Sequence, residues 1–284
     1  MNTQTAEFEF IKALSAELSS RNLVFPTSLK ATMNIRHALD NPDINNDQVA
    51  KLISMEPVLS AQVLMLANTA MFNRSSKKID ELKTAVGLMG FGVVRNVAIS
   101  VGMKQLKDQQ AHGQNSALME GLWTRSIRVA ALAFVIARNR TRVSPDKAMI
   151  AGLLHDIGKF YILSRICQYE NLLHPTETMW DLIDHWHVDI GTAILDSWEV
   201  ADDIRSAVMD HQNTNLPESS RPTLTDVLVA ADFLDEHFVK ESLENMDEDR
   251  LPVSMKNLNL DIKSIDVLMS ETRQEIAQIL KMLS

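Results

Sequence analysis

The sequence predicts an all-α fold, on three observations. Glycine and proline are scarce, at 9 and 8 of 284 residues. Leu, Ala, Met, Glu and Lys, which favour helices, are abundant. Apolar residues recur at steps of three and four, as on one face of a helix, and strand-like alternation is hard to find. With 45% hydrophobic residues, the chain can bury a large core.

The first expected helix covers residues 5–20. Phe8, Ile11, Leu14 and Leu18 lie three or four positions apart and form one apolar face. This spacing is typical of a helix that packs on a core with one side only.

Polar caps mark the next two helices. Thr27 or Ser28 can cap a helix that runs to about Leu39, because a short side-chain oxygen accepts a bond from an unpaired backbone amide. After a turn rich in Asx and proline, Asn45 or Asn46 can cap a third helix in the same way.

The following pair of helices surrounds a glycine cluster. Pro57 fits the first turn of a helix to about Phe72, which is apolar nearly all round and is expected to be buried. The next helix, over residues 79–89, ends at Gly90-Phe91-Gly92. These glycines indicate a helix-to-helix turn, since a dinucleotide-binding loop needs another spacing and a preceding strand.

A polar stretch at residues 107–115 indicates the main linker. We therefore divide the chain into an N-terminal helical subdomain (1–112), a second helical subdomain (113–240), and a charged segment with a C-terminal amphipathic helix (241–284). Proline and serine predict a loop at residues 212–223. The later helices are expected at about residues 117–138, 144–166, 177–186, 187–198, 201–210, 224–239 and 265–283.

Charge and composition limit the partners. The net charge of −9 repels phosphate backbones, which disfavours nucleic acid. The longest apolar run near the middle, Ala130–Ala137, is far short of the roughly 18 residues of a membrane span. The N-terminus has no signal-like core. Cys167, the single cysteine, excludes an intramolecular disulfide and fits a cytoplasmic protein.

The segment whose residues could bind a metal or a phosphate lies within residues 151–160. It places His155, Asp156 and Lys159 among Leu, Ile and Phe residues of an expected helix. Burial of these side chains is costly unless they are paired or bind a cation. On a helix, His155 and Lys159 are four positions apart and Asp156 and Lys159 are three apart, so the three side chains can lie on the same side of the helix. Imidazole and carboxylate suit a divalent metal and lysine suits a phosphate, whereas the alternative is a buried network without a ligand.

Three polar residues in later helices favour a site over an isolated pair. His187, His211 and Asp232 each belong to a separate segment with an apolar face. Each could direct its side chain toward the same point as His155 and Asp156.

The segment Leu153-Leu154-His155-Asp156-Ile157-Gly158-Lys159 resembles the signature of the HD-superfamily phosphohydrolases, above all the HD-GYP group that degrades cyclic di-GMP. The first half, through Ile53–Leu59, Leu64–Phe72 and Ala85–Gly90, resembles the HDOD domain, as does His187–Gly191. The match covers about Leu23 to Asp232. The resemblance implies an HD-like fold in a bacterial signalling or regulatory module without catalysis.

The resemblance also implies a set of metal ligands. It assigns them to His155, Asp156, His187, His211 and Asp232. Two departures weaken the site: Arg125 stands where the first histidine of the superfamily belongs, and Gln212 stands in place of the second histidine of a pair. The GYP extension is absent from the sequence.

Arg125 changes the chemistry of the expected site. A guanidinium has no lone pair for a metal and stays protonated. We hypothesise that Arg125 pairs with Asp156 or Asp232 and replaces part of the charge of a metal. The alternative is that Arg125 points to solvent.

Three functions remain open. The first is a regulatory module that binds a signalling protein or a small ligand and needs no cofactor. The second is a phosphohydrolase that keeps Fe, Mn, Zn or Mg on a reduced ligand set, with Lys159 binding phosphate. The third is a scaffold without a ligand. The C-terminal helix could support a homodimer.

Overall fold

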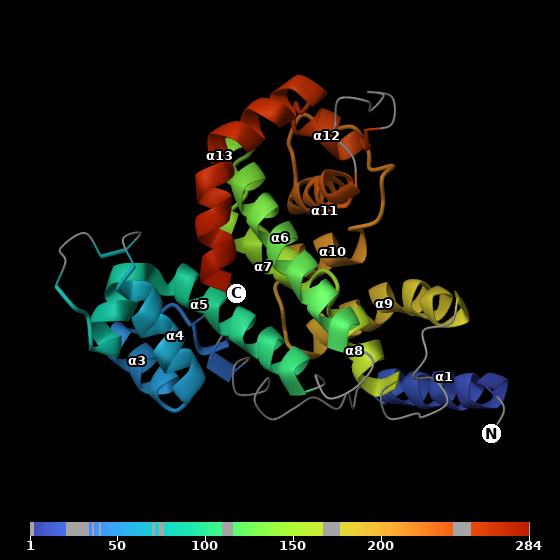
Figure 1. Ribbon diagram of the computed structural model, residues 1–284, viewed down its shortest axis with the longest axis horizontal. Coiled ribbons are helices and arrows are strands. Elements are labelled where there is room, and N and C mark those ends of the chain that lie inside the picture. Colours follow the sequence, from blue (N-terminus) through green and yellow to red (C-terminus); the bar gives the residue numbers. More distant parts are fainter. Residues whose placement is uncertain are drawn as a thin grey trace. The chain divides into compact units, whose positions relative to one another are not determined.

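The computed structural model describes residues 3–20, 34–35, 37–39, 41–69, 72–73, 77–109, 116–166, 177–240 and 251–283. Within these ranges the chain forms helices joined by loops and no strand (Figure 1). The predicted all-α class is confirmed. Most of the helix predicted at 27–39 lies outside the described residues, as do Cys167 and the segment 241–250.

The chain divides into two compact units. Residues 25–108 and 281–284 form the small unit, and residues 1–24 and 109–280 form the large unit. The boundary at 108 falls in the stretch that the sequence marked as a linker. Unlike the sequence-derived division, the large unit also includes the first 24 residues and the C-terminal segment to residue 280.

Polar contacts explain this grouping. Glu17 of the first helix binds Tyr161 and Arg165. Glu275 of the last helix binds Arg138. These pairs join residues more than a hundred positions apart, so no local sequence pattern reveals them.

In the small unit, α3 (Asn46–Ser54) and α4 (Pro57–Ala67) are short helices. Asn45 caps α3 and exchanges hydrogen bonds with Gln48, a capping box. Helix α4 ends five residues before the predicted end. There the Asn68 side chain donates one hydrogen bond to the Ile79 carbonyl oxygen and accepts one from the Ile79 amide. Val58 and Met65 are each 56% exposed, so the expectation that α4 is buried on all sides is wrong.

Helix α5 (Leu82–Gln109) is interrupted at Gly90, where the backbone is not helical. Gly90 has φ 76° and ψ 160°, a conformation that only glycine adopts without strain. The predicted helix-to-helix turn at Gly90 is therefore present, as a kink between two helical segments that together make up α5.

Residues 82–105 of α5 are, within the described ranges, the one segment long and apolar enough to cross a membrane. The most apolar window of this segment is 61% buried inside the protein, as in many core helices. It is therefore weak evidence for a membrane span. The sequence expectation rested on uninterrupted apolar runs and did not consider this helix.

The large unit is built around α6. Its helices are α1 (Thr3–Ser19), α6 (Ser116–Arg140), α7 (Pro145–Leu154), α8 (Ile157–Ile166), α9 (Glu177–Ser197), α10 (Asp202–Met209), α11 (Leu224–Lys240), α12 (Val253–Asn257) and α13 (Ile262–Leu283), of which α13 ends in the small unit. Helices α7, α8 and α11 pack against α6, and α9 packs against α8 (Figure 1). Small residues allow the close contact of α6 with α7: a Cβ on Gly152 would lie 2.5 Å from the Ala130 Cα atom.

Two element boundaries in the large unit differ from the prediction. The helix expected at 144–166 is divided into α7 and α8, which break at His155-Asp156. The two helices expected to meet at residues 186 and 187 are one helix, α9. No glycine, proline or capping residue stands at that junction, so local chemistry favours continuity. The short helix α12 has no counterpart in the prediction.

Replacement of Gly90 by alanine should destabilise the small unit by about 1–3 kcal/mol, because the methyl group makes the backbone conformation at Gly90 strained. Urea unfolding followed by circular dichroism measures the effect. Gly121→Ala is the control: Gly121 lies in α6 with open space around it, so alanine there should stabilise by up to about 1 kcal/mol. Equal effects of the two substitutions would contradict this account.

Candidate functional site

The break between α7 and α8 forms the centre of the site. His155 ends α7, and Asp156 follows it before α8 begins; both side chains are buried. The Nδ1 atom of His155 lies 2.7 Å from the Gly152 carbonyl oxygen, so this nitrogen donates the bond. The break therefore directs His155 Nε2 and the Asp156 carboxylate into the interior.

A close contact between α8 and α9 brings His187 to the same place. A Cβ on Gly158 would lie 1.9 Å from the His187 carbonyl oxygen and 2.9 Å from the Gly191 amide nitrogen. Only glycine fits at position 158 without a shift of the backbone. This contact explains the glycine two residues after Asp156.

The three buried histidines share one orientation. His187 Nδ1 lies 2.9 Å from the Asp184 carbonyl oxygen, and His211 Nδ1 lies 2.7 Å from that of Val208. His155 makes the equivalent bond to Gly152. Since a carbonyl only accepts, each Nδ1 carries the proton. Each Nε2 is left for the interior, as in metal-binding histidines held by backbone carbonyls.

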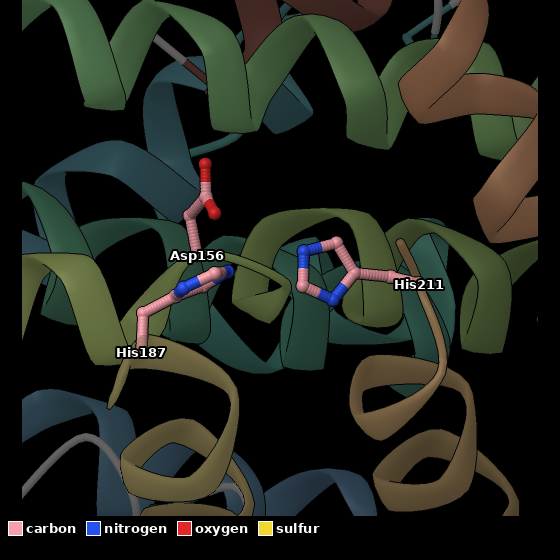
Figure 2. Close-up of side chains that lie close together, drawn as sticks. All are labelled: Asp156, His187 and His211. Atoms are coloured by element: carbon pink, nitrogen blue, oxygen red, sulfur yellow. The ribbon is translucent and has the colours of Figure 1, made fainter. Parts of the chain in front are cut away.

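Three donor groups converge closely enough to hold one metal ion. One ligand atom each from Asp156, His187 and His211 lies within 4.8 Å of the other two. Figure 2 shows the imidazole rings of His187 and His211 close together and steeply inclined to each other, with the Asp156 carboxylate beside them. Nε2 of His187 is buried without a hydrogen bond to any described residue. The oxygens of Asp156 lie 3.2 Å from His155 Nε2 and 3.0 Å from Lys159 Nζ. Imidazole nitrogen and carboxylate oxygen fit a divalent ion such as zinc, manganese or iron.

Arg125 of α6 occupies the other side of the site. Its Nη2 lies 2.6 Å from Asp232 Oδ1 on α11, and its Nε lies 3.4 Å from Asp156 Oδ2. The side chain of Arg125 is 24% exposed, and its guanidinium faces both aspartates rather than solvent. Asp232, a candidate metal ligand, is therefore bound to an arginine.

A second arginine–aspartate pair adjoins Arg125. Arg128 Nε and Nη2 lie 2.5 and 3.0 Å from the two oxygens of Asp235, a bidentate pair. Asp235 also lies 3.5 Å from Arg125 Nη1. The Arg128–Asp235 pair was not predicted from the sequence. The sequence does contain a pattern that indicates this pair. Arg125 and Arg128 on α6 are three positions apart, and so are Asp232 and Asp235 on α11.

His155 and Asp156 form a buried ion pair. Burial, the largest single cause, lowers the pKa of His155, but the attraction and hydrogen bond of Asp156 and the attraction of Asp232 together outweigh it, so the His155 pKa is raised. Burial raises the pKa of Asp156, yet the attraction of His155 and Lys159 holds it well below its usual value. Lys159 Nζ lies 3.0 Å from Asp156 Oδ1. Both charges of the pair are thus stabilised within the protein.

The other two histidines are neutral near pH 7. Burial, together with the charge of His155, lowers the pKa of His211 to about 3. Burial and the charge of Lys159 also lower the pKa of His187. For Asp232, burial raises the pKa, and the attraction of His155 and Arg125 offsets this only in part. His187 and His211 therefore keep the lone pairs that a metal needs.

The site opens to solvent through a pocket of about 590 Å³. Charged groups of both signs line it. Its lining comprises Arg125, Lys159, Asp184, His211, Gln212, Thr214, Val229, Asp232, Phe233 and Glu236. A ligand in this pocket would meet the exposed edges of Arg125 and Lys159.

The structure brings all the sequence-predicted site residues together. His155 Nε2 lies 3.2 Å from Asp156 and 3.4 Å from Asp232. The His211 ring centroid is 5.5 Å from that of His155 and 5.6 Å from that of His187. Within the described ranges, the group of three that could hold a metal includes neither His155 nor Asp232.

Fold and site together define a helical protein with an HD-type site. The HDOD domain family matches residues 25–214. The chain belongs to this family, as the sequence resemblance predicted.

Solved structures share the fold. A protein from Shewanella amazonensis, provisionally named a metal-dependent phosphohydrolase, is 23% identical with TM-score 0.69, covering 99% of this chain and 100% of its own. An HDOD domain protein of unknown function from Geobacter sulfurreducens is 22% identical with TM-score 0.66, over 96% and 97%. A protein from Marinobacter aquaeolei, provisionally named a signal transduction protein, is 17% identical with TM-score 0.60, over 99% and 65%.

A curated relative, an uncharacterized protein of Treponema pallidum, is 25% identical over 232 residues. The alignment covers 76% of this chain but 43% of the relative. The chain thus spans less than half of the length of that protein.

Replacement of Gly158 by alanine should destabilise the large unit by about 1–3 kcal/mol or prevent folding, because the new Cβ collides with the backbone of α9. Chemical denaturation measures the effect. Gly191→Ala tests the same helix contact from the other side, where a Cβ would have ordinary contacts at 3.5 Å, and should change stability much less. A well tolerated Gly158→Ala would contradict the packing described.

Proposed function

We propose that this chain is a non-catalytic regulatory module of the HDOD family, which acts by binding a protein or a small ligand. The observation that carries the proposal is the contact of Arg125 with Asp232 and Asp156. An arginine cannot bind a metal or act as a Lewis acid. It supplies fixed positive charge where the superfamily has a histidine ligand.

Charge balance within the site supports this proposal. Asp156, Asp232 and Asp235 all have side chains no more than 12% exposed. Cations of the same chain lie beside each carboxylate. They are Lys159 for Asp156, Arg125 for Asp232 and Arg128 for Asp235. The three carboxylates therefore need no divalent ion for compensation, and an added ion would meet fixed positive charges.

The same pocket supports a role in binding. Arg125 and Lys159 line it together with the apolar residues Val229 and Phe233. A small acidic ligand, or an acidic side chain of a signalling protein, would find positive groups beside an apolar wall. The solved relatives bear names of both kinds, phosphohydrolase and signal transduction protein, so Arg125 is the stronger argument.

A second function, a metal-dependent phosphohydrolase with a reduced ligand set, is favoured by one observation. Asp156, His187 and His211 converge and would hold one divalent ion. A bound ion would lower the pKa of a water and so provide a nucleophile. Lys159 would then orient a phosphate of the substrate, because its Nζ lies in the pocket beside Asp156.

Metal content and turnover distinguish these functions. The purified chain, expressed with iron, manganese or zinc and analysed by elemental mass spectrometry, should contain well under one equivalent of metal. It should hydrolyse neither a phosphate monoester nor a cyclic dinucleotide when Mn²⁺ or Mg²⁺ is added. Stoichiometric metal together with metal-dependent turnover would overturn the proposal in favour of the hydrolase.

Arg125→His should increase metal content toward one equivalent, because it removes the fixed charge beside Asp156 and Asp232 and adds a neutral ligand. Metal titration followed by elemental analysis measures the gain. Arg142→His, at an exposed position in the loop before α7, is the matched control and should leave metal content unchanged. No gain in Arg125→His, with folding intact by circular dichroism, would show that Arg125 does not determine metal binding.

A further inference from the structure

Helix α13 has an exposed side that no described helix covers. A groove of about 370 Å³ runs along it, lined by Asp266, Met269, Ser270, Arg273 and Ile276. The buried residues Ile265, Leu268 and Thr272 lie about 100° away around the helix, so the groove borders the packed side of α13. One flank of the helix therefore remains open beside the side that anchors it.

Contacts with α6 confirm which side is anchored. Glu275 binds Arg138, and the Ser264 carbonyl accepts a hydrogen bond from Arg140. Residues 264 and 275 lie on the part of the helix circumference that also holds the buried residues. Figure 1 shows α13 running beside α6 in the large unit.

The open side has the spacing of a coiled-coil seam. Ile262, Asp266, Met269, Arg273 and Ile276 follow one another in steps of four, three, four and three. This heptad spacing keeps the residues in one stripe along the helix, where a second helix can pack. Three of the five are apolar, and all five are half-buried or exposed.

The two charges in the stripe are of opposite sign and lie seven residues apart. Within the described part of the chain, neither Asp266 nor Arg273 forms an ion pair. About 10 Å of helix separates them, so they do not reach each other directly. In an antiparallel pair of identical helices, Asp266 of one copy would come close to the partner's Arg273, and the same contact would form a second time by symmetry.

We propose that a second copy of this chain docks on the exposed side of α13, forming a two-fold antiparallel helix pair with two Asp266–Arg273 contacts. The stripe is complementary to itself in charge, whereas a strongly acidic or basic partner would meet one like charge. The stripe lies beyond the HDOD match at residues 25–214, so the dimer contact belongs to the C-terminal extension. This proposal does not rest on the proposed function.

The dimer should be weak. A stable interface uses about 20–30 residues from each partner, far more than one helix face offers. We expect association that depends on concentration in the micromolar range, roughly the strength of a transient contact. Because the charge pairs are exposed, added salt should weaken it.

Charge exchange tests the proposal. Sedimentation velocity of the full chain over a hundredfold range of concentration should show a monomer–dimer equilibrium. Asp266→Arg and Arg273→Asp should each weaken dimerisation about tenfold or more, since each replaces two attractions by two repulsions. The double variant Asp266→Arg/Arg273→Asp restores both attractions and should recover the wild-type dimer.

Glu271→Arg provides the matched control. It makes the same change of charge on the same helix, on the side away from the stripe, and should leave association unchanged. Circular dichroism of each variant checks that the exposed substitutions keep the fold. A wild-type chain that stays monomeric at all concentrations, or a double variant that fails to recover the dimer, would overturn the proposal.

Discussion

Three aspartates lie in the interior of the large unit, and each of these buried carboxylates needs a cation beside it. The side chains of Asp156, Asp232 and Asp235 are 0%, 12% and 3% exposed. A carboxylate buried without a cation costs several kcal/mol, and loss of one partner of a buried pair typically costs about 3–5 kcal/mol. Their cations come from other positions in the chain: Arg125, Arg128 and Lys159. Asp232 and Asp235 of α11 are compensated only when α11 packs on α6, whereas Lys159 lies three residues from Asp156 in the same segment.

Close backbone contacts make that packing possible. Gly152 allows α7 to approach the Ala130 backbone of α6, and Gly158 allows α8 to approach α9 at His187. Larger side chains at these positions would hold the helices apart and move His187 away from Asp156. The two glycines thus affect the geometry of the site by allowing a short distance between helices, although neither bears a polar side chain.

Much of the fold follows from local sequence signals, because caps and apolar periodicity act within one turn. Asn45 and Ser144 cap helices as local chemistry predicts. The break at His155-Asp156 was not predictable in this way, since Leu and Ile on both sides favour a continuous helix. It depends on the packing of α8 on α9, which involves residues 30 positions away. The candidate ligands of the site were predicted from the family resemblance. The Arg128–Asp235 pair could be found only once the positions of α6 and α11 relative to each other were known.

An arginine and a metal ion compensate carboxylates in different ways. A metal ion binds several lone pairs at once, is exchanged with the surroundings and polarises water. The guanidinium of Arg125 is attached to α6, forms hydrogen bonds in one plane and stays charged at any ordinary pH. On the proposed function, Arg125 makes the charge of the pocket independent of metal supply. The three histidines would still present Nε2 inward, because backbone carbonyls of their own segments hold each Nδ1. Backbone bonds thus maintain the polar shape of the site. On the proposed function, the fixed charge that Arg125 adds there serves recognition of a ligand rather than its hydrolysis.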